Sequence, residues 1–443
     1  MRIVVVGAGI AGLTAAHDLV AAGHDVVVLE GADRAGGKLR RHKVAGVVVD
    51  VGAEAMLQVR PEGVELARSL GLEPVHPTDA ASRIWTRGEL RPLPRTLMGA
   101  PVDLDGLAAS GVLSEEGLAR AREERITPVE GDVSVGDLVA GRFGEEVTDR
   151  LVEPLLGGVY AGRSREISAR AAVPQLVALA ERGSIAEQAG SRPPSDGPVF
   201  AGISGGMAIL AEALAEGLDV RTGSPVRELR RTAGGFEARF ARTSTAVADA
   251  VVLATPAAPT AKLLAELAPD AARELAAIEY ASMAVVTLAF RAADVPQLAD
   301  TDASGFLVPP VDGRRIKAST FSFAKWGWVR EAGDGLLLMR TSLGRHREAA
   351  TLQGTDDELV AASLRDLADA IALDATPVDT HVQRWGGGLP QYALGHLDRV
   401  ARIRADVAKV PGLALAGAAY DGVGIPAVIA SGHRAAAEVV AAQ

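Results

Sequence analysis

The feature that most constrains the fold is a glycine-rich turn between a hydrophobic strand and a helix near the start of the chain. Residues 3–6 are apolar, and the sequence GAGIAG follows at residues 7–12. Apolar residues then recur at helical spacing, and residues 25–29 form a second apolar run that ends on Glu30. This order predicts a strand-turn-helix-strand unit of the kind that binds a dinucleotide.

Each glycine of this turn has its own physical role. Gly7 allows the tight turn, Gly9 lets backbone N–H groups approach a pyrophosphate, and Gly12 lets the helix pack closely on the sheet. The helix N-terminus favours the phosphates. Glu30 can accept hydrogen bonds from both ribose hydroxyls, which favours a cofactor without a 2′-phosphate. The cofactor-binding residues predicted in this unit are Gly7, Ala8, Gly9, Ile10, Ala11, Gly12 and Glu30.

Composition excludes several classes of function. The chain has 443 residues, 48% of them hydrophobic, which is enough for two or three domains. Its net charge is −10 (46 basic minus 56 acidic residues), so nucleic-acid binding is not expected. The chain has no cysteine, which excludes disulfides, thiolate catalysis and a flavin attached through cysteine. The histidines show no metal-ligand spacing, and no metal site is predicted.

The sequence also bears on location. No run reaches the roughly eighteen uncharged apolar residues that a membrane-spanning helix needs. The first strand begins at once, so no cleaved leader is expected. We therefore predict a cytoplasmic protein. Residues 101–190 carry frequent charges, which argues against deep membrane insertion but leaves peripheral membrane contact open.

Two further loops follow the N-terminal unit. The first contains Arg34, Gly36, Gly37 and Lys38, and the second is the sequence DVGAE at residues 50–54. With these loops the chain resembles the flavin-dependent amine oxidase superfamily, whose members carry an R-x-G-G-[RK] loop and a D-x-G-x loop here. The resemblance implies an FAD cofactor, with the first loop along its phosphates and ribityl chain and the second beneath the isoalloxazine. Glycines allow this close approach, and a basic side chain can neutralise phosphate. Without cysteine, we expect the FAD to be non-covalent.

The resemblance extends to later positions. It implies that Val226 gives a backbone contact to the adenine and that Trp385 lies beside the flavin. By itself Val226 is better explained as a core valine, and Trp385 is almost as well explained as a core tryptophan. A helix expected from residue 426 directs its N-terminus at the same site. The cofactor-binding residues that the resemblance implies are Arg34, Gly37, Lys38, Gly52, Ala53, Glu54, Val226, Trp385, Gly424 and Ile425.

Four stretches narrow the resemblance to the porphyrinogen oxidases of the haem pathway. They are residues 93–101, 151–176, 386–400 and 417–432, and the second, LVEPLLGGVYAGRSREISARAAVPQL, is the most diagnostic. The resemblance implies the removal of six electrons in three cycles. Each hydride passes to the flavin, and dioxygen reoxidises the flavin and yields hydrogen peroxide. Because the cofactor carries this chemistry, no catalytic residue is assigned.

Two substrate-binding residues are implied by the same resemblance. A turn at residues 157–160 is expected to place the Gly158 carbonyl near the macrocycle. Arg60 is expected to pair with a propionate through two parallel hydrogen bonds. The glycines could instead serve only packing, and Arg60 could be a solvent-exposed arginine. The alternatives to Arg60 that the sequence does not rank are Arg87, Arg91 and Arg345.

The choice of porphyrinogen depends on charge. Coproporphyrinogen carries four propionates, whereas protoporphyrinogen carries two propionates and two vinyl groups. An acidic chain with forty arginines (46 basic residues minus six lysines) suits the more soluble substrate, so coproporphyrinogen III is preferred over protoporphyrinogen IX. Other hypotheses are an amine oxidase or polyene desaturase, and a non-catalytic flavin-binding protein that hands porphyrin to the next haem-pathway enzyme. An aromatic content of 4% disfavours an aromatic cage for an amine.

The expected fold class is α/β, and α+β overall, with a Rossmann-like FAD domain, a mixed-sheet substrate domain and a mostly helical insertion domain. Short strand-like runs between residues 283 and 404 predict the mixed sheet. Prolines predict a loop over residues 90–101, and GSRPPSDGP at residues 190–198 predicts a linker. The predicted boundaries are 1–48, 203–265 and 405–443 for the FAD domain, 49–60, 82–100, 195–202 and 266–404 for the substrate domain, and 61–81 and 101–194 for the helical domain.

Overall fold

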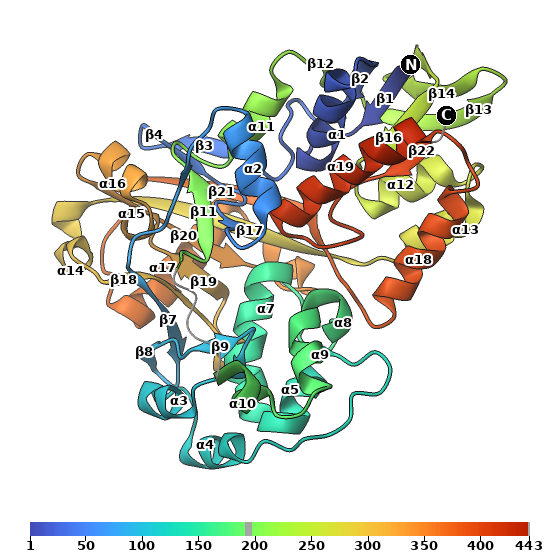
Figure 1. The fold of residues 1–443 in the computed structure, drawn as a ribbon. Helices are drawn as coiled ribbons and strands as arrows, with labels where there is room; N and C mark the ends of the chain where they lie inside the picture. Colours follow the sequence, from blue (N-terminus) through green and yellow to red (C-terminus); the bar gives the residue numbers. More distant parts are fainter. Residues whose placement is uncertain (191–196, 442–443) are drawn as a thin grey trace.

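The computed structural model describes residues 1–190 and 197–441. Residues 191–196 of the predicted linker lie outside the described part. Figure 1 shows three groups of elements, which are a parallel sheet around β1 (Arg2–Val6), a mixed sheet around β20 (Leu336–Leu343) and helices around α5 (Val135–Phe143). The predicted mixture of α and β structure is confirmed.

The parallel sheet contains the N-terminal unit. Helix α1 (Ile10–Ala21) connects β1 to its parallel neighbour β2, so the predicted strand-turn-helix-strand unit is confirmed. The other pairs in this sheet are also parallel. In sheet order the strands are β12 (Asp219–Arg221), β2 (Asp25–Leu29), β1, β16 (Ala250–Leu253) and β22 (Leu413–Leu415).

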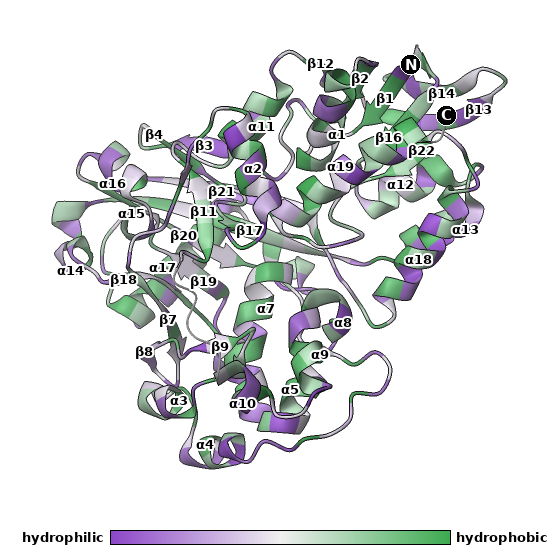
Figure 2. Ribbon diagram, viewed as in Figure 1, coloured by the Kyte–Doolittle hydropathy of each residue, from purple (hydrophilic) through white to green (hydrophobic). Residues whose placement is uncertain are grey.

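Helices cover both faces of this sheet, which explains why β1 is an unbroken apolar run. Ile3 and Val5 point into one core, and Val4 and Val6 point into the other. In Figure 2, β1 and β16 are green, whereas α18 carries much purple, as expected for a buried sheet and a surface helix. The first core takes residues from α1, α2 (Pro61–Ser69), α11 (Ala208–Ala215) and α19 (Ile425–Ala441), and the second from α12 (Ala257–Leu264), α13 (Pro269–Ala276) and α18 (His396–Val407).

Two details of this region matter for the site. A Cβ built on Gly432 would lie 2.5 Å from the carbonyl oxygen of Ala11, so α19 and α1 cross with their backbones in contact. Of residues 61–81, predicted to belong to the mostly helical domain, only α2 is helical; it ends at Ser69 and shares the core of α1 and α19. An antiparallel sheet packs on the second core and consists of β13 (Val226–Thr232), β14 (Gly235–Phe240) and β15 (Ser244–Ala248).

The mixed sheet is antiparallel except for the parallel pair β18–β7. Helix α17 (Asp356–Ile371) begins at a capping box of Thr355 and Glu358 and buries Leu359 and Leu367 against one face. In sheet order the strands are β21 (Asp379–Pro390), β17 (Tyr280–Arg291), β20, β19 (Ile316–Thr320), β18 (Ala303–Leu307), β7 (Ala81–Thr86) and β8 (Glu89–Pro92). Short helices connect them, namely η2 (Ala292–Asp294), α14 (Pro296–Ala299), η3 (Pro310–Asp312), α15 (Ser322–Lys325), α16 (Gly327–Gly333) and η4 (Ala349–Leu352).

The loop predicted for residues 90–101 is partly wrong. Residues 89–92 form β8, which pairs with β7 at the edge of the mixed sheet, where a proline costs no ladder hydrogen bond. The remaining short strands are β3 (Arg41–Val44) with β4 (Val47–Asp50), β5 (Met56–Leu57) and β6 (Pro74–Val75) with β11 (Phe200–Ile203), and β9 (Thr96–Leu97) with β10 (Ala100–Pro101).

Residues 104–190 are mostly helical, as expected for the predicted helical insertion domain, and their apolar side chains form most of a separate core. The division into three domains at the expected boundaries stays a prediction. The helices are α3 (Leu104–Ser110), α4 (Glu115–Arg122), α5, α6 (Glu145–Val147), the π-helix η1 (Thr148–Val152), α7 (Glu153–Tyr160), α8 (Ala169–Ala172), α9 (Pro174–Ala180) and α10 (Ile185–Gly190).

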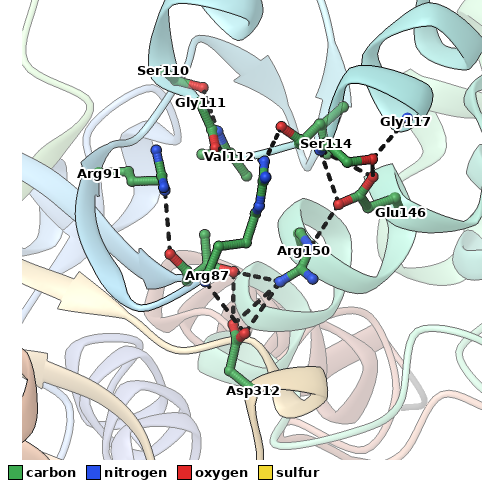
Figure 3. Close-up of polar contacts among 12 residues, drawn as sticks. Arg87, Arg91, Ser110, Gly111, Val112, Ser114, Gly117, Glu146, Arg150 and Asp312 are labelled. Carbon is green, nitrogen blue, oxygen red and sulfur yellow. Dashed lines mark hydrogen bonds and ion pairs between the residues drawn. The ribbon is translucent and has the colours of Figure 1, made fainter.

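A polar cluster fastens these helices to the mixed sheet (Figure 3). Arg150 of η1 donates to the Thr86 hydroxyl at 2.7 Å and pairs with Asp312 at 3.2 Å. Thr86 also donates to Asp312 at 2.6 Å. On the helical side, Arg150 pairs with Glu146 at 2.9 Å, and Glu146 accepts from the Ser114 hydroxyl at 2.6 Å. The cluster therefore fixes the helices relative to the β7–β8 hairpin.

Within residues 1–190 and 197–441, no helix combines the length and the apolar character that crossing a membrane requires.

Candidate active site

The glycine-rich turn leaves open space beside the N-terminus of α1. Gly7 has a φ of +103°, which favours glycine, and a Cβ on Gly12 would overlap the Gly7 carbonyl oxygen. A Cβ on Gly9, in contrast, would meet no protein atom within 4 Å. Gly7 and Gly12 are therefore required by the fold itself, whereas the fold leaves room for a side chain at Gly9.

The helix end at this turn offers free backbone donors. Gly9 is the N-cap of α1 and gives no side-chain cap, and the first N–H to bond within the helix is that of Leu13, to the Gly9 carbonyl at 3.0 Å. The N–H groups before Leu13 thus have no partner within the helix. The R-x-G-G-K loop runs alongside, because the Gly36 N–H donates to the Ala8 carbonyl at 2.8 Å. Such an arrangement suits an anion.

Glu30 closes the same site from the end of β2. Its two carboxylate oxygens accept from the backbone N–H groups of Ala8 at 2.6 Å and Ala32 at 2.7 Å. Each oxygen retains a second lone pair for a further donor. The Glu30 carbonyl accepts from the Ser224 N–H at 2.7 Å, so the segment before β13 and its first residue Val226 lie near Glu30 despite their separation in sequence.

The two basic residues of the R-x-G-G-K loop have different surroundings. Lys38 is exposed, yet the protein around it displaces water from its ammonium group, and this desolvation lowers the pKa of Lys38. Arg34 is half-buried, and its Nη2 is buried without a hydrogen-bond partner. Arg34 borders a cavity of about 400 Å³ that Arg40, Arg41 and the alanine face of α11 also line.

The D-x-G loop is held between several segments. The Asp50 carboxylate accepts from the Met207 N–H at 2.8 Å, and burial raises the Asp50 pKa to about 7. A Cβ on Gly52 would overlap the Lys38 carbonyl oxygen and would lie 3.0 Å from the Trp385 ring. Trp385 donates from Nε1 to the Val51 carbonyl at 3.2 Å. Trp385 therefore lies directly against this loop.

Glu54 holds the loop through a half-buried ion triad. It pairs with Lys325 at 2.6 Å and with Arg340 at 2.8 Å. Burial alone would raise the Glu54 pKa, but Arg340 and Lys325 lower it to about 2. Arg340 also donates to the carbonyls of Asp50 and Gly52, both at 3.0 Å. These contacts are those of a residue that positions the loop, and direct contact of Glu54 with a cofactor stays a prediction.

Sequence reasoning missed Lys325 and Arg340. One signal was available for Arg340, because it interrupts the apolar run GLLLMRTSL, where a buried arginine requires a partner. Nothing local indicated Lys325, which reaches Glu54 from α15.

The start of α19 lies near α2. The helix begins at Ile425, and the exposed Gly424 accepts from the Val428 N–H at 3.0 Å. A Cβ on Gly63 of α2 would lie 3.5 Å from Pro426. Arg60 is the N-cap residue of α2, and its half-exposed side chain pairs with Glu62 at 2.6 Å. A substrate carboxylate would have to compete with Glu62 for this arginine.

The turn predicted at residues 157–160 is wrong, because these residues lie in helix α7. Tertiary packing of the helix overrides the glycine pair, since Leu156 and Tyr160 are buried in the helical core. A Cβ on Gly157 or Gly158 would meet no atom within 4 Å. Gly157 is buried and Gly158 is exposed, but no side chain fills the space beside either one. The helix therefore presents a face of bare backbone there, on which a flat molecule could lie closely.

The alternative arginines also differ. Arg87 donates to the carbonyls of Gly111 and Leu113, and Arg91 pairs with Glu89 at 2.9 Å, so both belong to the β7–β8 region (Figure 3). Arg345 follows β20, and its Nη2 is buried without a hydrogen-bond partner.

Comparison with known proteins agrees with the geometry of this site. The family described as flavin containing amine oxidoreductase matches residues 10–440. The chain belongs to this family. It is therefore a flavin-dependent oxidoreductase, and the open turn at Gly9 with the donors of α1 is compatible with a flavin dinucleotide.

Individual relatives cover almost the whole of this oxidoreductase. A protein of Mycobacterium tuberculosis named coproporphyrinogen III oxidase is 38% identical over 99% of this chain and 97% of the relative. A Bacillus subtilis protein of the same name is 28% identical over 99% and 98% of the two chains. A solved structure of a proposed protoporphyrinogen oxidase from Exiguobacterium sp. 255-15 has a TM-score of 0.89 and 29% identity, covering 100% of this chain and 99% of that one.

Proposed function

We propose that this protein oxidises coproporphyrinogen III to coproporphyrin III, with non-covalently bound FAD and with dioxygen as the electron acceptor. The observation that carries the proposal is the 38% identity, over nearly the full length of both chains, with a protein named coproporphyrinogen III oxidase. The site described above supports it, because the chain combines a glycine-rich turn, N–H groups at a helix N-terminus and the carboxylate of Glu30. We also propose a cytoplasmic location.

The residues that would hold the dinucleotide follow from their contacts. The N–H groups at the start of α1 would bind the pyrophosphate, and the space beside Gly9 admits it. The free lone pairs of Glu30 would accept the ribose hydroxyls. The ammonium group of Lys38 would neutralise phosphate charge. With no cysteine in the chain, these contacts would hold the cofactor without a thioether bond.

Further residues would enclose the isoalloxazine. Gly52, which Arg340 and Trp385 hold in place, would form one wall, and the N-terminus of α19 at Ile425 would direct its positive end at the ring. When bound, FAD supplies the hydride acceptor and passes the electrons to dioxygen. One coproporphyrinogen and three dioxygen then give one coproporphyrin and three hydrogen peroxide, which balances the six electrons.

The protein's own task is to position the substrate. The bare backbone face of α7 at Gly157 and Gly158 offers a place for a flat macrocycle. Arg60 would bind a propionate if it exchanges Glu62 for the substrate. We assign no catalytic side chain, because the positions of the ring and the acceptor determine which bridge hydrogen leaves.

The test is oxidation of coproporphyrinogen III by purified protein, followed through dioxygen uptake and porphyrin absorbance. We expect three dioxygen consumed per porphyrin formed, and yellow FAD released into the filtrate after denaturation. Flavin that stays on the precipitated protein would contradict non-covalent binding. Absence of porphyrin formation beyond the rate without enzyme would contradict the activity.

Protoporphyrinogen IX is the second candidate substrate, because a Macaca fascicularis protein named protoporphyrinogen oxidase is also 29% identical over 99% of this chain. The same assay with both porphyrinogens decides between them. A higher kcat/KM for protoporphyrinogen IX would overturn the preferred substrate while leaving the reaction type intact. In either case the product would pass to the next haem-pathway enzyme.

A further inference from the structure

Lys317 is a buried lysine without a counter-ion. It lies in β19, its side chain is 2% exposed, and its Nζ donates to the Gly157 carbonyl of α7 at 3.3 Å. Within the described residues, no carboxylate lies within 4.0 Å of this nitrogen. Buried ammonium groups are ordinarily paired, since taking the charge out of water costs several kcal/mol. Lys317 thus requires an explanation.

Arg345 places a second unpaired cation beside the first. It follows β20, the neighbour of β19, and its Nη2 is buried without a hydrogen-bond partner. In the described part of the chain, no carboxylate pairs with it within 4.0 Å. Arg345 is close enough to Lys317 to lower the pKa of the lysine through charge repulsion, after the larger effect of burial. Two like charges here increase the energetic cost of leaving both unpaired.

The nearby carboxylates are committed elsewhere. Glu153 accepts from the Ser164 N–H and hydroxyl at 3.0 and 2.6 Å. Glu348 forms an ion pair with Arg163 at 3.6 Å. Asp366 of α17 accepts from the N–H groups of residues 315 and 316 at 2.8 and 2.9 Å. None of these groups makes an ion pair or a hydrogen bond with Lys317 or Arg345, so neither cation has a carboxylate partner among the described residues.

The position of this pair relates it to the active site. Ile316 packs in the core that α17 also lines, and the register of β19 shifts between Ile316 and Ala318, at Lys317. The Lys317 side chain reaches Gly157 on the bare face of α7. Figure 1 shows α7 as the helix of its group beside the mixed sheet. Strand β21, which carries Trp385 against Gly52, is three strands from β19, or about 14 Å at the usual spacing. A tetrapyrrole with a bridge carbon near Trp385 could extend a propionate this far.

We propose that Lys317 and Arg345 form a carboxylate-binding site for a propionate of the substrate. The proposal rests on the proposed function, because it needs a substrate with carboxylates at its edge. A carboxylate would give both cations the partner that they lack within the protein. It would accept charge-assisted hydrogen bonds from Nζ of Lys317 and Nη2 of Arg345. Because Arg60 lies at the start of α2, whereas the pair lies on the mixed sheet beside α7, the pair would serve a different propionate.

The binding test uses holoprotein and coproporphyrin III, with its tetramethyl ester as a ligand of the same shape without charge. Lys317→Met and Arg345→Gln should each weaken binding of the free acid about tenfold, as expected for one charge-assisted pair. Binding of the ester should not change. Arg345→Lys, which keeps the charge, should retain most of the affinity. Lys262→Met, at an exposed position on α12, is the matched control and should behave as wild type.

A second measurement detects proton uptake by Lys317 when the ligand binds. Burial and then Arg345 lower the Lys317 pKa to about 7, whereas Glu348 opposes this shift. Around Arg345 the other charged groups are Glu153, Arg163 and Asp366. A bound carboxylate would raise the Lys317 pKa, so at pH 7 wild type should take up about half a proton on binding. Calorimetry in two buffers of different ionisation enthalpy should detect this uptake, and Lys317→Met should abolish it.

The outcomes separate the two proposals. If wild type does not oxidise coproporphyrinogen III, the proposed function fails. If wild type oxidises it while Lys317→Met and Arg345→Gln bind the free acid as tightly as wild type, only the carboxylate site is overturned. Equal losses for the acid and the ester would likewise overturn it, because the residues would then act through packing. Flavin content of each variant, measured by absorbance, checks that the cofactor site is intact.

Discussion

Gly9→Ala separates cofactor binding from folding more sharply than any other single change in the turn. Gly9 has a φ of −73° and a ψ of 174°, which alanine adopts without strain. Its Cβ would meet no protein atom within 4 Å. We therefore expect the variant without cofactor to be as stable as wild-type protein without cofactor. The methyl group would instead occupy the space proposed for the pyrophosphate.

The expected magnitude follows from ligand linkage. Wild type at a free FAD concentration 100 times its Kd gains about 2.7 kcal/mol from the cofactor. If the methyl group weakens FAD binding 100-fold or more, nearly all of this gain disappears. The assay is thermal unfolding of both proteins with and without added FAD, together with flavin content after purification. The FAD-dependent rise in Tm should be present in wild type and absent in the variant.

Gly12→Ala is the control for this experiment. Its Cβ would overlap the Gly7 carbonyl oxygen, so it should destabilise the protein both with and without FAD. A Gly9→Ala variant that retains full flavin content would refute the reasoning, because the open space beside Gly9 would then not be the pyrophosphate site. Loss of stability without FAD in Gly9→Ala would refute the packing argument instead.

Three further predictions concern charged groups. Glu54→Gln should lower the free energy of unfolding by about 3–5 kcal/mol, because Lys325 and Arg340 lose their partner. In wild type, ionised Glu54 has a folded pKa of about 2, so its contribution to the free energy of unfolding should be present above pH 4.5 and should fall between pH 4.5 and 2. Denaturant unfolding at pH 4.5 and at pH 2 checks this. Lys317→Met should be more stable than wild type below pH 7, and the gap should close as pH rises from 7 toward 10.5, because the folded pKa is about 7; a gap that does not depend on pH would contradict burial of the charge. Arg60→Ala should raise KM about tenfold, roughly 1.5 kcal/mol, with little change in kcat; unchanged steady-state kinetics would leave Arg60 as a surface residue.

The parts of the fold that the sequence predicts well are those with a local cause. The turn at residues 7–12 carries its own conformational requirement, and both β1 and β2 are apolar runs beside it. The helices of residues 104–190 follow from apolar spacing. Prediction fails where position in the fold decides, as at β8, where a sheet edge tolerates Pro92. It fails in the same way at Gly157 and Gly158, where packing keeps a glycine pair helical.

In the candidate site, too, the sequence predicts the features with a local cause and misses those that depend on the tertiary fold. Motifs predict the loops that carry Gly7, Gly37 and Gly52, because backbone conformation or close packing requires glycine at these positions. The pairing of Glu54 with Lys325 could not be predicted, since the two residues are 271 positions apart and only the tertiary fold joins them. For the same reason the sequence could not choose among the candidate propionate-binding arginines. They differ in whether the fold places a hydrogen-bond acceptor or a carboxylate next to the guanidinium.

The D-x-G loop links the two halves of the site, and its contacts indicate how a change in one half reaches the other. Asp50 binds it to the start of α11 on the parallel sheet, while Arg340 binds it to the mixed sheet. The wall proposed for the flavin is thus tied to both sheets. Helix α7, with the bare face proposed for the substrate, belongs to the helical core, which the Arg150–Asp312 pair connects to the mixed sheet. Disruption of the Arg150–Asp312 pair should therefore shift the bare face of α7 relative to the D-x-G loop. The turn at the start of α1 shares no residue with the Arg150–Asp312 pair or with the Arg340 contacts, so it should keep its geometry.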